Sequence, residues 1–323
     1  MRKTLLAGGA GFIGTKLAAA MVGAGYEIDI IDDLSRGAND KDLGKIVASG
    51  RARFHQIDLL TPGALDTFGN HYQVVVHLAA ILGVRNVLER PYQTLRDNVL
   101  AQEATIQFGK RQLNLERFLF TSTSEVYAGS VLHFDPPFPT PEDTPIALPP
   151  LSEPRTSYLL SKIYGEAMLM HSGLPYTIVR PHNVYGPRMG MAHVIPQVLE
   201  RAHRAPDGGS IDLFSPDHMR TFCFIDDAVE MVMLLLKSTA ARNQVVNLGA
   251  DAPEYTMRQV AQIIVDTIGK RLTFDEKPPT RGSPVRRAPE MVRMKELTGY
   301  SAKTELGAGV QQTYLWYKQN VFA

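Results

Sequence analysis

Two groups of side chains in the sequence could carry out acid–base chemistry on a hydroxyl group. The first is Tyr158 and Lys162, which stand four positions apart in a stretch of helical character and therefore share one face of a helix. An ammonium group close to a phenol lowers the pKa of the phenol, so we expect Tyr158 to act as a general base near neutral pH. Tyrosine and lysine at this spacing are also common on protein surfaces, so the pair needs support from other residues.

The second group is the run Thr-Ser-Thr-Ser-Glu-Val-Tyr at residues 121–127, directly after an apolar strand. In open α/β sheets, ligands bind at the carboxyl ends of the strands, where we expect these hydroxyl groups and Glu125 to lie. The two groups together offer a phenol base, a hydroxyl group that orients a substrate alcohol, and a carboxyl group. For Glu125 two interpretations stay open: a catalytic carboxylate, or a structural one that holds the turn.

A nucleotide site is predicted at the first glycine-rich turn. Gly8, Gly11 and Gly14 lie between a short apolar strand and a helix, a pattern that lets backbone N–H groups approach a pyrophosphate at the positive helix end. Asp32 ends the next strand, where it can accept both hydroxyl groups of an adenosine ribose and would repel a 2′-phosphate. NAD is therefore expected rather than NADP. Arg36 is a nearby cation that could pair with a phosphate or simply face solvent.

The elements around these residues alternate between strands and helices. Apolar runs predict strands at 5–7, 28–31, 74–77, 118–121 and 177–180, with helices at 12–25, 91–111 and 157–171 between several of them. Strands separated by helices require crossover connections, so we predict an α/β fold with a Rossmann-type, doubly wound parallel sheet. Segment 135–154 holds eight of the 21 prolines and is interpreted as an irregular loop within one domain rather than a linker.

The pattern changes after residue 180 and predicts a smaller C-terminal lobe. A helix near 195–205 and another after the capping box formed by Thr256 and Gln259, ended by Gly269, belong to it. Residues 220–237 and 245–248 are expected to return to the first domain. We therefore predict an NAD-binding domain of residues 1–180 with residues from about 218 to 249, and a substrate-binding lobe of residues 181–217 and 250–323.

Composition excludes several classes of function. The formal net charge is +1, without the basic excess that is typical of chains that bind nucleic acid or anionic membranes. Cys223 is the single cysteine, so neither an intrachain disulfide nor a thiolate metal cluster can form, and no metal site is expected. The start is not interpreted as a signal peptide, and the apolar run 229–236 is too short to span a bilayer. A cytoplasmic protein is expected.

Six motifs in the same order give a resemblance that runs over nearly the whole chain. They are Gly8-Gly-Ala-Gly-Phe-Ile-Gly14, His77-Leu-Ala-Ala80, Ser122-Thr-Ser-Glu-Val-Tyr127, Tyr158-x-x-x-Lys162, Arg180-Pro-His-Asn-Val-Tyr-Gly-Pro187 and Arg220-x-Phe-x-Phe-Ile-Asp-Asp227. The chain resembles the extended short-chain dehydrogenase/reductase family, and within it the NAD-dependent nucleotide-sugar epimerases and dehydratases.

The resemblance implies a role for each matched residue. Thr123 would hydrogen-bond the 4-hydroxyl group of a nucleotide-diphosphate sugar while Tyr158 removes its proton, and hydride would pass from C4 to bound NAD. The implied substrate contacts are Ser122, Thr123, Asn183, Arg220 and Arg287. The implied cofactor contacts are Gly8, Gly11, Phe12, Ile13, Gly14, Asp32, Asp33, Ser35, Asp58, Leu59, Leu78, Ala79, Ala80, Asn98, Thr121, Tyr158, Lys162 and Pro181. A homodimer built on the helices at 91–111 and 157–171 is implied as well.

The later chemistry stays open between epimerase, dehydratase and decarboxylase. Ser124 stands where glucose-type 4,6-dehydratases carry an aspartate, whereas the Thr-Ser-Glu order resembles GDP-mannose-type dehydratases and UDP-glucuronate decarboxylases. Arg286-Arg287-x-Pro also resembles the decarboxylases, while the runs 79–83 and 158–162 resemble general epimerases. Two rivals from other classes are a simple NAD-dependent alcohol dehydrogenase or reductase and a non-catalytic NAD-binding regulator, although the presence of both Tyr158 and Lys162 argues against the regulator.

Overall fold

A seven-stranded parallel sheet forms the centre of the molecule. The computed structural model describes residues 2–279 and 284–322. The strand order is β11-β6-β5-β4-β1-β2-β3, so the chain winds outward in both directions from β1, and the predicted Rossmann-type fold is confirmed. The strands are β1 (Lys3–Ala7), β2 (Glu27–Asp32), β3 (Ala52–Gln56), β4 (Val74–His77), β5 (Arg117–Thr121), β6 (Tyr176–Pro181) and β11 (Gln244–Leu248).

The central strands are apolar because both faces of the sheet are covered. Leu5 and Leu6 of β1 are both fully buried, yet their side chains belong to two different cores. Leu6 packs in the core that includes Leu17 of α1 (Phe12–Gly23), and Leu5 packs in the core that includes Phe108 of α4 (Pro91–Lys110). When a parallel sheet is covered on both sides, the sequence of each central strand is a nearly continuous run of apolar residues.

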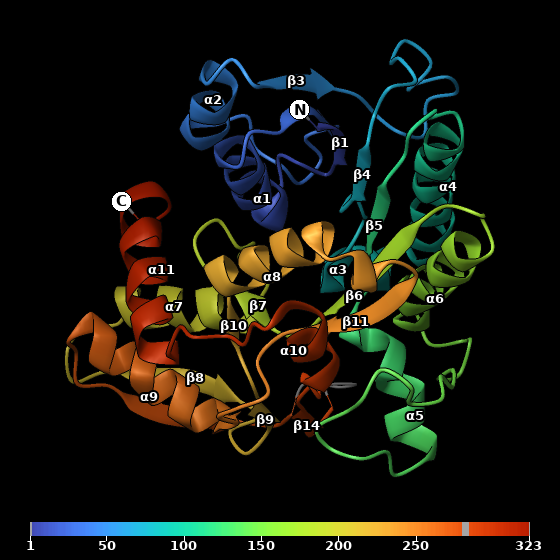
Figure 1. Ribbon diagram of the computed structural model, residues 1–323. Helices are drawn as coiled ribbons and strands as arrows, with labels where there is room; N and C mark the ends of the chain where they lie inside the picture. Colours follow the sequence, from blue (N-terminus) through green and yellow to red (C-terminus); the bar gives the residue numbers. More distant parts are fainter. Residues whose placement is uncertain (1, 280–283, 323) are drawn as a thin grey trace.

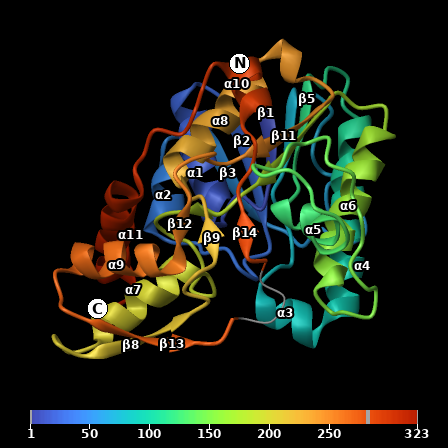
Figure 2. The same cartoon turned by 90° about the horizontal axis from the view of Figure 1, so that it is seen from below.

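Helices cover the two faces separately, as Figures 1 and 2 show. On one face α1 packs against α2 (Lys41–Ala48) and α8 (Ile225–Lys237), and on the other α4 packs against α6 (Thr156–Met170). The short helix α3 (Val84–Glu89) leads into α4. The helices predicted at 91–111 and 157–171 end within one residue of their observed bounds. No helix among the described residues is long and apolar enough to cross a membrane.

Smaller sheets and helices form a second layer beside the main sheet (Figure 1). The small strands are β7 (Val184–Tyr185), β8 (Ser210–Phe214), β9 (Met219–Arg220), β10 (Cys223–Phe224), β12 (Tyr255–Thr256), β13 (Thr273–Lys277) and β14 (Arg286–Arg287). The helices are α7 (Val194–Arg204), α9 (Met257–Ile268), α10 (Val292–Thr298) and α11 (Leu306–Asn320). The capping box at Thr256 and the left-handed Gly269 are present as predicted, and β11 returns to the edge of the main sheet beside β6. The exact division into two domains stays a prediction.

The proline-rich segment 135–154 is irregular chain between α5 (Ala128–His133) and α6. Two hydrogen bonds, made by the buried residues Glu142 and Thr140, tie it down. The Glu142 carboxylate accepts the backbone N–H of Asn247 at 2.8 Å, and the backbone N–H of Thr140 donates to the carbonyl of Ala288 at 2.8 Å. The loop therefore joins the end of β11 to the segment that carries β14.

Candidate active site

The glycine turn after β1 leaves no room for side chains. Gly8 has φ +80°, and a Cβ atom there would lie 2.6 Å from the backbone nitrogen of Ala79, while a Cβ at Gly14 would overlap the Gly8 carbonyl. Gly11 caps α1 without a side-chain hydrogen bond, and the first turn carries no acidic residue. The open N–H groups at this helix end suit a pyrophosphate.

Asp32 lies beside this turn with its carboxylate held by the backbone. Its Oδ2 accepts the N–H of Ala10 at 3.0 Å and its Oδ1 accepts the N–H of Leu34 at 2.9 Å. Burial raises the pKa of Asp32, against the effect of these two hydrogen bonds. Each carboxylate oxygen keeps a second lone pair for a ribose hydroxyl, so the turn and Asp32 together fit an adenine dinucleotide.

The remaining residues predicted to contact the cofactor divide into three groups. Leu78, Ala79 and Ala80 follow β4 and lie half-buried beside the glycine turn, and Pro181 ends β6. Asp58, which is exposed, and Leu59 follow β3, whereas Asp33 binds the backbone N–H and hydroxyl of Ser35. Asn98 holds the loop after β4 instead of facing outward, because its amide bonds both backbone groups of Ile81.

Tyr158 and Thr123 meet at the carboxyl end of β5. A hydrogen bond joins their side chains, and the Thr123 hydroxyl also accepts the backbone N–H of Glu125 at 3.2 Å. The sequence prediction of a lowered phenol pKa is wrong for this arrangement. Burial, followed by the nearby Glu125 carboxylate, raises the pKa of Tyr158 to about 12, and the hydrogen bond with Thr123 only partly opposes this.

Lys162 explains why the expected pKa effect is missing. Its ammonium group donates to the carbonyl oxygen of Thr121 at 2.8 Å and lies 6.0 Å from the centre of the Tyr158 ring. Burial lowers the pKa of Lys162 to about 7, so the amine is protonated in only part of the molecules at neutral pH. The shared helix face is confirmed, but the lysine acts on the strand end rather than on the phenol oxygen.

Glu125 is paired with an arginine from a distant part of the chain. The guanidinium group of Arg287 on β14 donates to Glu125 Oε1 at 2.6 Å. Arg287 first, and then Arg155 and Arg220, lower the pKa of Glu125 against the effect of burial. The contact of Arg287 with a diphosphate stays a prediction. In the structure, one nitrogen of its guanidinium group is already bonded to the Glu125 carboxylate.

Arg220 and Asn183 lie close to this pair. The Arg220 guanidinium donates to the carbonyl of Val285 at 3.1 Å, and the Asn183 amide donates to the carbonyl of Thr221 at 2.9 Å. Burial first, and then the neighbouring Arg287, lower the pKa of Arg220 to about 10. The guanidinium groups of Arg287 and Arg220, together with that of Arg155, thus act on one carboxylate, that of Glu125.

Ser122 does not join the site. Its hydroxyl is buried and donates to Glu166 of α6 at 2.5 Å, and the same carboxylate forms a bidentate pair with Arg180 at 2.9 and 2.7 Å. The Ser122 hydroxyl therefore faces the packed side of the strand end, and the substrate contact predicted for it stays a prediction.

Two arginines of this region were not identified from the sequence. Arg155, at the start of α6, acts on Glu125, and Arg188, which follows the Tyr-Gly-Pro motif, binds the glycine turn. Neither has a spacing to its target that a sequence pattern could reveal. Among residues 2–279 and 284–322, no group of three His, Cys, Asp or Glu side chains is arranged to hold a metal ion.

Comparison with known proteins agrees with this geometry. Residues 4–249 match the model of the NAD dependent epimerase/dehydratase family. The chain is 28% identical to a UDP-N-acetyl-alpha-D-glucosaminuronate decarboxylase of Bacillus cytotoxicus, with 98% of both chains covered, and 26% identical to UDP-glucuronic acid decarboxylase 1 of Arabidopsis thaliana, with 95% and 68% covered. A UDP-glucose 4-epimerase structure from Thermotoga maritima is 26% identical, with a TM-score of 0.85 and 99% of both chains covered.

The chain therefore belongs to the NAD-dependent epimerase/dehydratase family. It is an enzyme of the group that includes nucleotide-sugar epimerases, dehydratases and decarboxylases.

Proposed function

We propose that this enzyme decarboxylates a UDP-linked uronic acid through a 4-keto sugar, with NAD as its bound cofactor. The observation that carries the proposal is the contact of Arg287 with Glu125 beside Tyr158 and Thr123. Tyr158 would take the proton of the sugar 4-hydroxyl while Thr123 holds the oxygen. NAD, bound at the glycine turn and Asp32, would supply the acceptor for hydride from C4 and later its donor.

The charges around Glu125 support an anionic sugar. Arg287 lies close enough to Arg220 to add to the effect of burial in lowering the pKa of Arg220, and the Glu125 carboxylate opposes this repulsion. A second anion at this point would relieve it. A uronic acid brings a carboxylate at C6, whereas a neutral hexose brings none.

The ionised state of Glu125 argues against the 4,6-dehydratase alternative. Loss of water from C6 needs an acid that protonates the departing hydroxyl group. The pKa of Glu125 is lowered by Arg287, so the group stays a carboxylate and is poorly suited to that task. Decarboxylation needs no such acid: the C5–C6 bond breaks, its electron pair passes into the C4 ketone, carbon dioxide leaves and C5 takes up a proton.

The proposal is tested by the mass and structure of the product. The purified enzyme with added NAD is incubated with UDP-glucuronate and, separately, with UDP-N-acetylglucosaminuronate, followed by mass spectrometry and sugar NMR. We expect loss of carbon dioxide and a pentose product. Loss of water, or no reaction with either uronic acid while a neutral UDP-sugar or a GDP-, dTDP- or CDP-sugar is converted, would contradict it.

A 4-epimerase acting on a UDP-sugar is the second candidate. The likeness to the UDP-glucose 4-epimerase structure over almost the whole chain favours it. It shares the roles of Tyr158 and Thr123 and differs in the fate of C6. Unchanged mass with an inverted C4 centre would select it.

We further propose a homodimer that buries the exposed sides of α4 and α6. Three large apolar or aromatic side chains on these helices are about half exposed to solvent or more. They are Tyr92 and Leu100 on α4 and Tyr164 on α6. The two helices pack side by side, so a second copy could extend them into a four-helix arrangement. Light scattering at several concentrations tests this.

A further inference from the structure

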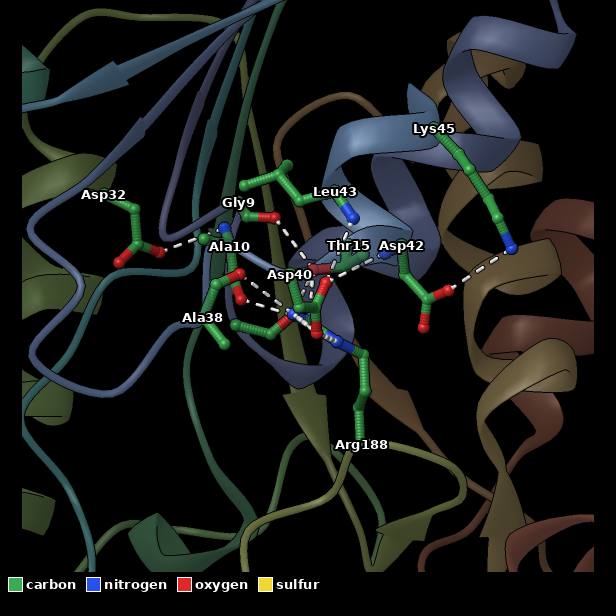
Figure 3. Close-up of polar contacts among 11 residues, drawn as sticks. Gly9, Ala10, Thr15, Asp32, Ala38, Asp40, Asp42, Leu43, Lys45 and Arg188 are labelled. Atoms are coloured by element: carbon green, nitrogen blue, oxygen red, sulfur yellow. Dashed lines mark hydrogen bonds and ion pairs between the residues drawn. The ribbon is translucent and has the colours of Figure 1, made fainter. Parts of the chain in front are cut away.

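Arg188 connects the second layer of the molecule to the glycine turn, as Figure 3 shows. It lies in the loop between β7 and α7 with φ +68°. Its Nε and Nη2 donate to Asp40 Oδ2 at 2.9 and 2.7 Å, and Nη2 also donates to the carbonyl of Ala38 at 3.0 Å. Its Nη1 donates to the carbonyls of Ala10 at 3.1 Å and Gly11 at 3.2 Å and to the Thr15 hydroxyl.

These carbonyl contacts determine the orientation of the turn. In a trans peptide the C=O and the following N–H point in opposite directions. When Arg188 holds the carbonyl of Gly11, it therefore also sets the direction of the Phe12 N–H, which is one of the free donors at the start of α1. The same region is fixed from the other side, because the N–H of Ala10 donates to Asp32.

The contribution of Arg188 is one of geometry more than of charge. The two carboxylate oxygens of Asp40 have different partners. Oδ1 caps α2 by accepting the N–H groups of Asp42 and Leu43, and Oδ2 pairs with the Arg188 guanidinium. The ion pair cancels most of the positive charge. What remains particular to arginine is the planar fork that reaches the glycine turn, the Ala38 carbonyl and Asp40 at once.

We infer that Arg188 is a positioning residue for the dinucleotide cofactor, so that the affinity for NAD depends on a side chain supplied by the segment that is predicted to bind the sugar nucleotide. The inference rests on the proposed NAD site and adds a determinant to it. Arg188 holds the back of the turn, and the N–H groups on the other side hold the pyrophosphate. A lysine at this position has one nitrogen and cannot make all the contacts.

The test measures NAD binding directly, by calorimetric titration of cofactor-free protein. The variants are R188K and R188A, with R204A as the matched control, because Arg204 on α7 makes an exposed pair with Glu200. We expect the Kd for NAD to rise about tenfold or more in R188A, and to rise also in R188K, since several hydrogen bonds that order the donors are lost. R204A is expected to stay within about twofold of the unaltered protein.

Two further readouts separate positioning from a general loss of structure. Thermal unfolding of each cofactor-free variant reports on the fold, and if R188A does not fold, R188K alone decides. At saturating NAD, kcat is expected to stay within a few-fold of normal, because Arg188 does not touch the reacting atoms. Unchanged NAD affinity in folded R188K and R188A would overturn the inference. If the unaltered protein bound no NAD, the proposed function would fail instead.

Discussion

Arg287 and Glu125 are 162 positions apart in the chain, yet their side chains meet at 2.6 Å beside the proposed base Tyr158. The contact joins the end of β5 in the main sheet to β14 in a small sheet. It lowers the pKa of Glu125 and so keeps a carboxylate next to the hydroxyl groups of Thr123 and Tyr158.

Removal of the Tyr158 hydroxyl should abolish the acid–base step and spare the cofactor. We expect Y158F to lower kcat by at least about a hundredfold, the scale for loss of a general base, with NAD still bound. Turnover of the sugar nucleotide and calorimetric NAD titration measure the two effects. Y314F, which removes a tyrosine hydroxyl group on α11 that pairs with His203, is the control and should keep normal turnover. Near-normal turnover of Y158F would remove Tyr158 from the mechanism.

The neutral variant E125Q distinguishes the two roles of Glu125. Glutamine keeps the shape but removes the charge that faces Arg287. If the carboxylate takes part in the reaction, carbon dioxide release should fall by about a hundredfold or more, while the Kd for NAD stays the same. Product release is followed by NMR with UDP-glucuronate. A variant with normal turnover, or with unchanged interconversion of 4-epimers, would show that Glu125 is structural.

Ser122 and Thr123 should respond differently to mutation although they are adjacent. The Ser122 hydroxyl donates to buried Glu166, so S122A should lower the free energy of unfolding by about 1 kcal/mol and leave KM within about twofold. Thr123 bonds Tyr158, so T123V should lower kcat, and because valine also loses the hydrogen bond from the Glu125 N–H, the free energy of unfolding should fall by about 1 kcal/mol as well. Urea unfolding and steady-state kinetics test both. A raised KM in S122A with normal stability would return Ser122 to the substrate site.

Asp29 should make the stability of the fold depend on pH in the acid range. Burial would raise the pKa of this β2 carboxylate, but hydrogen bonds from Arg53, Tyr72 and His55 outweigh it and hold the pKa at about 2, below the usual 3.8. Such a group stabilises the fold above about pH 4, and this contribution is lost as the pH falls toward 2. Linkage puts it at about 2 kcal/mol.

The measurement is the free energy of unfolding of the protein and of D29N between pH 5 and about pH 3. The difference between the two should shrink as the pH falls. D66N is the control, since Asp66 makes an exposed pair with Arg111 and should change little. A constant difference across the range would contradict the assignment of a low pKa to Asp29.

Most of the main sheet could be predicted because its strands are buried on both faces. The exception is β3, which was not predicted. It is an edge strand in which Arg53 and His55 point to Asp29 of the neighbouring strand, so its sequence lacks the apolar run of the others. An apolar run predicts a strand because buried strands are made of apolar residues. Only the first residue of β3 is buried, so β3 has no such run.

The candidate site divides along the same line. Gly8, Asp32 and Tyr158 could be recognised because each lies in a local pattern of a few residues with a characteristic spacing. The partner of Glu125 comes from β14, and its position depends on how the small sheets pack, which no spacing encodes. Ser122 and Thr123 carry the same functional group, and only the position of Glu166 shows which of them is buried.

The late position of β14 has a consequence for the order in which the enzyme becomes complete during synthesis. All seven strands of the main sheet have left the ribosome once Leu248 has emerged, and a domain can fold as soon as its chain is available. Arg287 follows almost forty residues later. A nascent chain can thus form the glycine turn and the helix that carries Tyr158 before Arg287, the partner of Glu125, has been synthesised, so we expect the Glu125–Arg287 pair to be among the last parts of the site to form.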